Sequence, residues 1–489
     1  MNRVGRVQVW CTAILCLGLL GSSPSQAADT SATFLAGAYA QDISPQKFPI
    51  SLNGGMSDQQ AKGVHDPLHA RCIVLNSKNP ASDDRTSLAI VVCDSCMIPR
   101  DLMDRAKALA SKKTGIPTSN ILISATHAHS CPTVTGVFQS EPDADYVEFL
   151  VEKIAKGIEQ AQSQLEPARI GWGAIDEPSQ LFNRRWLLKE GETVVNPFNG
   201  TSDRALMNPG LSNPKVTASI GLIDPQLSIL SIQSRSGRPI ALLANYSLHY
   251  VGGVEGGLAS ADYYGEFAQR IKRHLNASTV EPAFVGIMSN GTSGDVNNID
   301  FSQKSIPARA PYEQIQFVAE LLAQDAVRVC NQIQYQDYVP LACREKELEL
   351  GVRKPSEQDI TQAKMKLDAI KTWPLGDMPS IYARETVLLA EYPATVKVKV
   401  QAIRIGSLGI ATSPCETFTE TGLAIKKESP FNQTFTIELA NGYNGYLPPP
   451  GQFLLGGYET WRARSSYLAE DSEPKIRATA LELLSELNK

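Results

Sequence analysis

Apolar runs alternate with helix-period patterns along most of the chain. Continuous apolar runs predict buried strands at residues 88–92, 121–123, 240–244 and 283–288. Amphipathic spacing predicts helices at residues 100–113, 146–164, 264–275 and 311–330. Such alternation is typical of α/β folds, because each helix carries the chain back to start a parallel strand. We therefore expect an α/β fold: one large catalytic domain built on a mostly parallel central sheet.

The stretch from residue 335 to 400 has a different pattern. A charged strand-like piece at 346–352 precedes a helix at 356–371, and Pro374 and Pro379 indicate turns. Residues 395–403 alternate apolar and polar side chains, as a half-exposed antiparallel strand does. We expect this stretch to form an antiparallel edge layer of the same domain. A last helix is predicted at residues 474–487.

The N-terminus has the pattern of a targeting segment. Arg3 and Arg6 precede a largely apolar stretch at 7–20, and Ser25-Gln26-Ala27 has the small-x-small form of a signal peptidase site. The apolar stretch is shorter than the ~20 residues that a membrane span needs. We expect residues 1–27 to be a signal peptide and residues 28–489 an exported domain, periplasmic or secreted, with no transmembrane span.

Composition narrows the function classes. A 43% hydrophobic content with 20% charged residues is ordinary for a globular protein and excludes a disordered chain. A formal net charge of −5 argues against nucleic acid as a partner. Seven cysteines follow the signal peptide, and Cys93 and Cys96 form a C-x-x-C without a thioredoxin pattern around it. We expect buried or locally bridged cysteines.

Three of the six histidines stand near strand ends. His127 and His129 follow the apolar run 121–123, and residues i and i+2 of a strand point to the same face. His249 follows the run 240–244. Ligands of α/β folds bind outside the carboxyl ends of the strands, and zinc is a common partner of neutral imidazoles. The pattern predicts a zinc site, and leaves open which of His127 and His129 touches the metal.

Further strand ends stop in polar clusters. The run 283–288 leads into residues 289–298, which include Asp295, and the run 408–411 leads into Glu416. A third cluster at residues 441–446 follows the run 435–439. Glu416, at a strand-to-helix junction, is a candidate carboxylate ligand. Five such clusters at five strand ends predict one shared active site.

The ordered motifs resemble those of the neutral/alkaline non-lysosomal ceramidases, a family of zinc amidases. The motifs that carry the resemblance are Thr126 to Pro132 (T-H-A-H-S-C-P), Asn183-Arg184, Asn245 to His249, Gly294-Asp295-Val296, Pro414-Cys415-Glu416, and Tyr446 with Tyr458-Glu459. The resemblance implies hydrolysis of an N-acyl, ceramide-like amide by metal-activated water. The substrate would be a small-molecule or lipid amide, and contact with a membrane surface is left open.

The resemblance also implies roles for single residues. The implied zinc ligands are His127, His249, Glu416 and Tyr446. The implied residues of the reacting centre are His129, which would pass a proton to the leaving amine, Arg184 and Tyr458, which would stabilise the oxyanion, and Asp295 and Asn297 in the G-D-V segment. Asp262 or Asp295 is a candidate acceptor behind His249, since metal-bound histidines usually donate to a carboxylate or a carbonyl.

The sequence departs from the family pattern at several positions. Asn297 occupies the place of a family serine; an amide cannot act as nucleophile, although its NH₂ can donate to an oxyanion. Ser293 is an alternative hydroxyl. Cys131 and Cys415 replace family glycines, and a disulfide between them is one possible arrangement. After Tyr458 about 30 residues remain, so we expect no C-terminal immunoglobulin-like domain.

Two other functions stay open. An amidohydrolase of another class would use H-x-H on a strand with two further histidines, yet only His249 and His274 follow, and His274 is predicted on a helix face. A non-catalytic or divergent exported protein that retains the metal cleft is the second alternative, motivated by Asn297. Within the leading hypothesis, an acylated ester could also replace the amide.

Overall fold

The core of the fold is an eight-stranded sheet. The computed structural model describes residues 1, 34–79 and 84–489, so the predicted signal peptide lies outside the described residues except for Met1. The strand order is β16-β14-β13-β8-β1-β5-β6-β7. The bounds are β1 Phe34–Asp42, β5 His69–Lys78, β6 Arg85–Cys93, β7 Ile121–Ala125, β8 Glu166–Asp176, β13 Gln226–Ser234, β14 Pro239–Tyr246 and β16 Val285–Asn290.

The sheet is mixed, and the expectation of mostly parallel strands is wrong. Only two neighbouring pairs are parallel, β6 with β7 and β14 with β16, and the other neighbours are antiparallel. A parallel pair needs a crossover of a dozen or more residues. Helices α1 (Arg100–Thr114) and α3 (Asp262–His274) provide these two crossovers. The turn between β13 and β14 is much too short for one, so these strands form a hairpin.

A second sheet packs against the first. It has the order β18-β19-β20-β22, with bounds β18 Leu341–Gly351, β19 Thr395–Ile405, β20 Leu408–Thr412 and β22 Gln433–Ile437. The expected antiparallel pairing holds for β18 with β19 and for β19 with β20, but the layer covers a face of the first sheet and does not extend its edge. The pair β20–β22 is parallel, with α7 (Thr419–Glu428) as its crossover.

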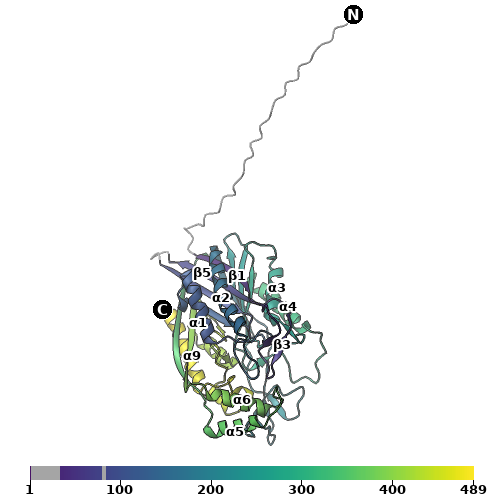
Figure 1. Cartoon of the computed structure of the whole chain (residues 1–489). Helices are drawn as coiled ribbons and strands as arrows, with labels where there is room; N and C mark the ends of the chain where they lie inside the picture. The colour runs from purple at the N-terminus through teal and green to yellow at the C-terminus, as the bar shows by residue number, and fades with distance from the viewer. Residues whose placement is uncertain (2–33, 80–83) are drawn as a thin grey trace. The chain divides into compact units, whose positions relative to one another are not determined.

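Alternating side chains of the strands build three apolar layers. In β19, Ile403 and Ile405 face the first sheet, whereas Val398 and Val400 face helix α9 (Ser472–Leu487). On the other side of the first sheet lie α1, α2 (Ala144–Ser163), α3 and α4 (Glu313–Cys330). Figure 1 shows α1 and α2 next to β1 and β5, and α9 below α1 on the left-hand side of the view. The result is a helix–sheet–sheet–helix stack, in which each fully buried Leu or Ile contributes about 1.5–3 kcal/mol.

Most predicted helices lie where the pattern places them. Helices α1, α2, α3, α4, α5 (Glu357–Asp368) and α9 differ from the predicted ranges by at most three residues at either end. Helix α6 (Met378–Ala390) was not predicted, because Pro379 was interpreted only as a turn residue. Short elements complete the fold: β2 Ile50–Leu52, β3 Gln59–Ala61, β4 Gly63–Val64, β9 Phe182–Asn183, β10 Arg185–Leu188, β11 Ala205–Met207, β12 Val216–Ser219, β15 Leu258–Ala259, β17 Val296–Asn297, β21 Glu416–Thr417, β23 Tyr446–Leu447 and α8 Pro450–Phe453.

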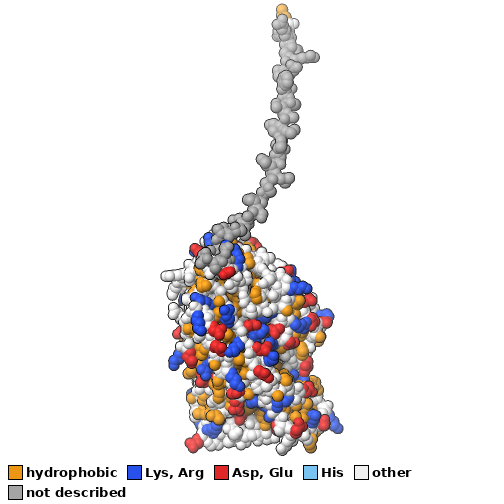
Figure 2. Space-filling model, turned by 90° about the vertical axis from the view of Figure 1, so that its left-hand side faces the viewer, with side chains coloured by type: hydrophobic (Ala, Val, Ile, Leu, Met, Phe, Trp, Pro, Cys, Tyr) orange, Lys and Arg blue, Asp and Glu red, His pale blue; other side chains and the backbone are white. Residues whose placement is uncertain are grey.

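The surface carries both charge signs, and the cysteines lie inside. Figure 2 shows acidic and basic side chains intermixed over the visible face. Many charged side chains of the surface form ion pairs, as Arg105 does with Glu148 and Lys113 with Glu159. All seven described cysteines are free thiols and six are buried, so Cys131 and Cys415 form no disulfide. Among the described residues, we find no helix with the length and apolar character that a bilayer crossing requires.

Candidate metal centre

The two parallel strand pairs end at one place in the interior. His127 follows β7 and His249 follows β14, and their Nε2 atoms are 2.9 Å apart. Both side chains are buried. His127 has a φ of 74°, a left-handed backbone that is uncommon for a residue with a Cβ. The backbone at His127 is therefore locally strained, at the position where the His127 ring turns toward His249.

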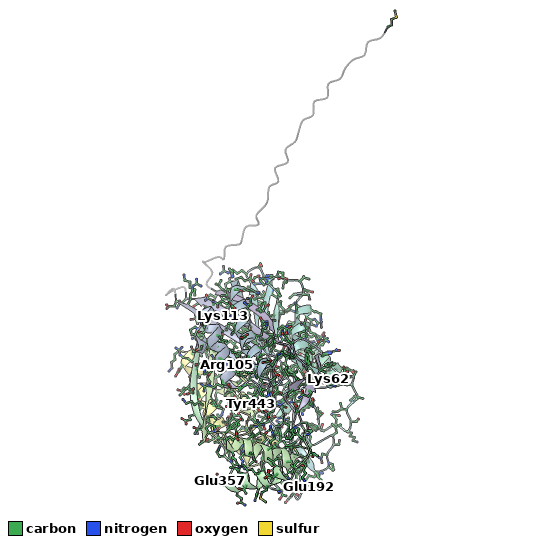
Figure 3. All side chains as sticks on the ribbon, viewed as in Figure 1. Lys62, Arg105, Lys113, Glu192, Glu357 and Tyr443 are labelled. Atoms are coloured by element: carbon green, nitrogen blue, oxygen red, sulfur yellow. The ribbon has the colours of Figure 1, made fainter. Side chains whose placement is uncertain are left out.

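Glu416 completes a group of three potential ligands. Its Oε2 lies 3.2 Å from His127 Nε2 and 3.8 Å from His249 Nε2. Glu416 begins β21, which pairs in parallel with β23, so Tyr446 lies beside it. Tyr443 donates a hydrogen bond of 3.1 Å to Glu416 Oε1, and Figure 3 labels this tyrosine near the middle of the view.

The donor set fits a divalent metal. Ligand atoms of His127, His249 and Glu416 all lie within 4.8 Å of one another. Glu416 Oε2 is buried without a hydrogen-bond partner among the described residues, which would cost free energy unless a cation neutralises it. Imidazole and carboxylate together suit zinc and other borderline metals. Cys96, His127 and His129 form a second such group.

Backbone carbonyls orient the two buried imidazoles. His127 Nδ1 lies 2.8 Å from the carbonyl oxygen of Cys96, and His249 Nδ1 lies 3.1 Å from that of Ser293. A carbonyl oxygen can only accept, so each Nδ1 carries the proton and each Nε2 lone pair faces the other ligands. Asp262, a candidate for this supporting role, instead accepts backbone N–H groups of residues 251 and 252.

Burial and charge favour the metal-binding protonation states of His129, His249 and Glu416, whereas His127 shifts the other way: burial opposes its charge, but Cys96 and Glu416 raise its pKa well above the usual range. Burial lowers the pKa of His249 and of His129 well below the usual range, and the neighbouring His127 lowers them further. Burial opposes the charge of Glu416, but His127 and a hydrogen bond from Tyr446 hold the pKa of this carboxyl below its usual value. Neutral imidazoles and an ionised carboxylate are the forms that bind metal.

His129 lies at the edge of the centre. Its Nε2 is 3.1 Å from His127 Nε2, and its ring stacks on Tyr250 with 3.9 Å between centroids. Gly54 packs against the His129 ring from another side. His129 is thus wedged between two elements, with one nitrogen directed at the metal group.

Arg184 and Tyr458 also reach this region. Arg184 Nη2 donates to the Tyr446 hydroxyl at 3.0 Å and to the Gly294 carbonyl at 2.8 Å. Glu459 holds the other side of the guanidinium through Nε, at 3.1 Å. The Tyr458 ring stands edge-on to Tyr446, with 5.6 Å between centroids. The structure therefore brings seven candidates together: His127, His129, Arg184, His249, Glu416, Tyr446 and Tyr458.

The G-D-V segment supports the centre from behind. Asp295 accepts hydrogen bonds from Asn183 and Thr419, and burial raises the pKa of its carboxyl. Asn297 uses its NH₂ on Asn208 and its oxygen on the backbone of Ile299, so neither atom is directed at the metal group. A short β-ladder pairs Asn297 with β9, the strand that leads into Arg184, and the catalytic role of Asn297 stays a prediction.

Sequence reasoning missed three aromatic and acidic contacts of the centre. Tyr443, Tyr250 and Glu459 were not among the predicted site residues, although each stands within three positions of one that was. Spacing alone does not predict which neighbour of His249 or Tyr458 turns inward. Only the folded structure shows that these three side chains point toward the centre.

Two hollows meet at His129. A cleft of only about 20 Å³ opens on the metal group and is lined by aromatic and apolar side chains that include Met97, Phe138, Tyr443 and Tyr458. A larger cavity of about 290 Å³ adjoins it and is bounded by the glycine-rich stretch 252–257. Gly54, Gly55 and His129 line both hollows. His129 thus stands between the two hollows.

The sequence profile of the N-terminal domain of neutral/alkaline non-lysosomal ceramidases matches residues 34–303, more than half of the chain. The chain belongs to this family. The match contains His127, His129, Arg184 and His249. Glu416 and the tyrosines of the centre lie after it.

Individual ceramidases are similar over different lengths. The neutral ceramidase of Pseudomonas aeruginosa is 28% identical over 256 residues, which are 49% of this chain and 33% of that protein. The aligned region thus spans about a third of the curated relative. The crystal structure of the Pseudomonas aeruginosa neutral ceramidase has a TM-score of 0.70 at 18% identity, and covers 93% of this chain and 74% of its own. A ceramidase complexed with C2 gives a TM-score of 0.69 at 16% identity, with 94% and 75% covered.

Proposed function

We propose that this ceramidase-family chain is an exported zinc-dependent amidase that hydrolyses an N-acyl, ceramide-like amide. The observation that carries the proposal is the convergence of His127, His249 and Glu416 from three strand ends, with Arg184 beside them. The metal ligands would be these three residues and Tyr446. Export rests on the predicted signal peptide, residues 1–27, with residues 28–489 as the catalytic domain.

The residues divide the chemistry between them. A bound zinc supplies Lewis acidity at the amide carbonyl and makes water a nucleophile at neutral pH. Arg184, held by Glu459 and Gly294, orients the carbonyl oxygen and stabilises its developing negative charge. A preorganised donor of this kind contributes about 3–4 kcal/mol to the transition state.

His129 is the proposed proton donor. Its neutral form, favoured by burial, first accepts the proton that the nucleophile releases and then transfers it to the leaving nitrogen. Tyr250 and Gly54 hold the ring on its two sides, so the proton path needs no rearrangement. Tyr458, beside Tyr446, would add a second hydroxyl toward the carbonyl oxygen.

The hollows suggest how a substrate would lie. The narrow aromatic cleft has room for the carbonyl group at the metal centre, and the larger cavity beyond His129 suits the amine. We propose a small-molecule or lipid amide as substrate, presented in solution or at a membrane surface.

Metal content and hydrolysis together test the proposal. Residues 28–489 and the variants His127→Ala and Glu416→Ala are purified, loaded with zinc, and assayed on N-acyl amides and matched esters. We expect about one zinc per chain, lost together with hydrolysis in both variants. His274→Ala is the matched control, because His274 pairs with Glu320 on the surface of α3 and α4. Zinc binding without hydrolysis of any substrate would favour a non-catalytic metal-binding protein.

A further inference from the structure

We propose that Glu438 is a positioning residue that fixes the distance between His249 and Glu416. The inference rests on the metal centre of the proposed function and concerns a residue outside it. Glu438 directly follows β22 in the second sheet and is fully buried. A fully buried carboxyl is rare unless partners hold it.

Two loops of the centre meet on this one carboxyl group. Ser293 Oγ lies 2.7 Å from Glu438 Oε1, and the Ser293 backbone N–H donates to Oε2 at 3.3 Å. The backbone N–H of Thr417 donates to the same Oε2 at 2.7 Å. Ser293 belongs to the loop after β16, and Thr417 belongs to β21. Glu438 thus joins a loop of the first sheet to a strand that carries a ligand.

Each residue that the Glu438 carboxyl contacts is directly connected to a proposed metal ligand, by a hydrogen bond or by the next peptide bond. The carbonyl of Ser293 accepts from His249 Nδ1, and Thr417 directly follows Glu416. Gly294 N–H donates to the Thr417 carbonyl at 2.8 Å, which ties the same two loops again. A Cβ on Gly294 would stand 2.6 Å from the Glu416 carbonyl oxygen, so these backbones are as close as glycine allows.

The surrounding backbone locks Glu438 itself. Its own N–H donates to the Asn290 carbonyl at the end of β16. Three residues later, the N–H of Asn441 donates to the Ile123 carbonyl in β7. The segment 438–441 therefore spans the ends of β16 and β7, the two edge strands of the first sheet. The carboxyl of Glu438 has little freedom to follow a loop that moves.

An acceptor at this position is required by the two backbone N–H groups. Removing the carboxyl would leave the N–H groups of Ser293 and Thr417 buried without partners, and the loops would separate to find others. Glutamine can replace it, because its oxygen can accept from both N–H groups while its NH₂ donates to Ser293 Oγ. Leucine fills similar space and offers no acceptor.

Zinc affinity of the purified chain, measured by competition with a chelator, tests the inference. We expect Glu438→Leu to raise the zinc dissociation constant about 10–100-fold, as loss of an outer contact of a metal site does. Glu438→Gln should stay within about threefold of wild type, and the Co²⁺ absorption spectrum should change in the leucine variant alone. Asp325→Leu is the control, since Asp325 is an equally buried carboxylate on α4.

The outcomes separate this inference from the proposed function. Equal zinc affinity in wild type and Glu438→Leu would overturn the inference, whatever the protein hydrolyses. Wild type that binds zinc but hydrolyses no amide would contradict the amidase alone. Wild type that binds no zinc would overturn both. If Glu438→Leu does not fold, Ser293→Ala decides: zinc binding several-fold weaker supports the inference, and unchanged affinity overturns it.

Discussion

The variant Gly54→Ala should displace the His129 ring without changing metal binding, and so tests what the position of His129 contributes to the reaction. Gly54 has a φ of +114°, and a Cβ placed there would stand 2.5 Å from His129 Cβ and 2.7 Å from His129 Nδ1. Ordinary contacts of a Cβ begin near 3.4 Å. The imidazole must therefore shift by about 1 Å, and Tyr250, stacked on the same ring, limits the direction in which it can move.

The expected loss follows from that displacement. A misplacement of about 1 Å at a reacting group costs about 10²-fold in rate. We therefore expect kcat/KM for an N-acyl amide to fall about 100-fold. Zinc content should not change, because the three atoms nearest to a Cβ at Gly54 all belong to His129 and none to the proposed ligands. The left-handed backbone adds about 1–3 kcal/mol of strain to the folded state, which thermal unfolding would show.

Gly115→Ala is the matched control for the strain. Gly115 ends helix α1 with a φ of +74°, and nothing lies within 4 Å of a Cβ added there. This variant should lose similar stability and keep full activity. Activity of Gly54→Ala within threefold of wild type would refute the reasoning, since it would mean that the place of His129 does not matter to the reaction.

Three further predictions concern charge. Glu459→Ala leaves Arg184 and Arg185 buried without their carboxylate and should lower the free energy of unfolding by about 3–5 kcal/mol in denaturant titration; a change below 1 kcal/mol would contradict this. Burial raises the pKa of Glu438 to about 8, so the unfolded chain releases this proton first and stability falls by about 1.4 kcal/mol per pH unit between about 4.5 and 8. Glu438→Gln should remove that fall, and an unchanged pH–stability profile would argue against it. Of the described residues lining the cavity beyond His129, none is Lys or Arg, and Glu255 is an exposed carboxylate. Glu255→Lys should therefore raise kcat/KM for N-acylglycine relative to N-acylethanolamine about fivefold, about 1 kcal/mol; an unchanged ratio would place the amine elsewhere.

The position of the centre could be predicted although the sheet was not. Strand-end reasoning requires only that the strands carrying His127 and His249 each have a parallel neighbour, and both do. In each case a helix with a clear 3.6-residue period separates the two strands. The antiparallel strand β8 carries mixed apolar and polar residues, so the apolar pattern did not reveal it, although a helix, α2, precedes it as well.

Other features depended on long-range geometry. Glu438 is one acidic residue in an apolar strand end, and no local pattern indicates that two distant N–H groups converge on it. Asn297 stands in a motif of the reacting centre, and only the folded structure shows its contacts with Asn208 and Ile299. Helix α6 was within reach of sequence reasoning, because Asp377 caps it and Pro379 stands in its first turn, which are helix-start signals.

The proposed metal ligands lie far apart in the sequence, and this separation affects when the site can form during synthesis. His127 and His249 emerge from the ribosome in the first 249 residues, whereas Glu416 is added late. A nascent chain that has folded only its first sheet therefore contains the two histidine ligands of the proposed site but not its carboxylate ligand. The proposed metal site is therefore complete only after the second sheet has docked, and an ion bound there would stabilise both sheets by its binding free energy. A metal held by His127, His249 and Glu416 would therefore mark a chain whose synthesis and sheet docking are complete.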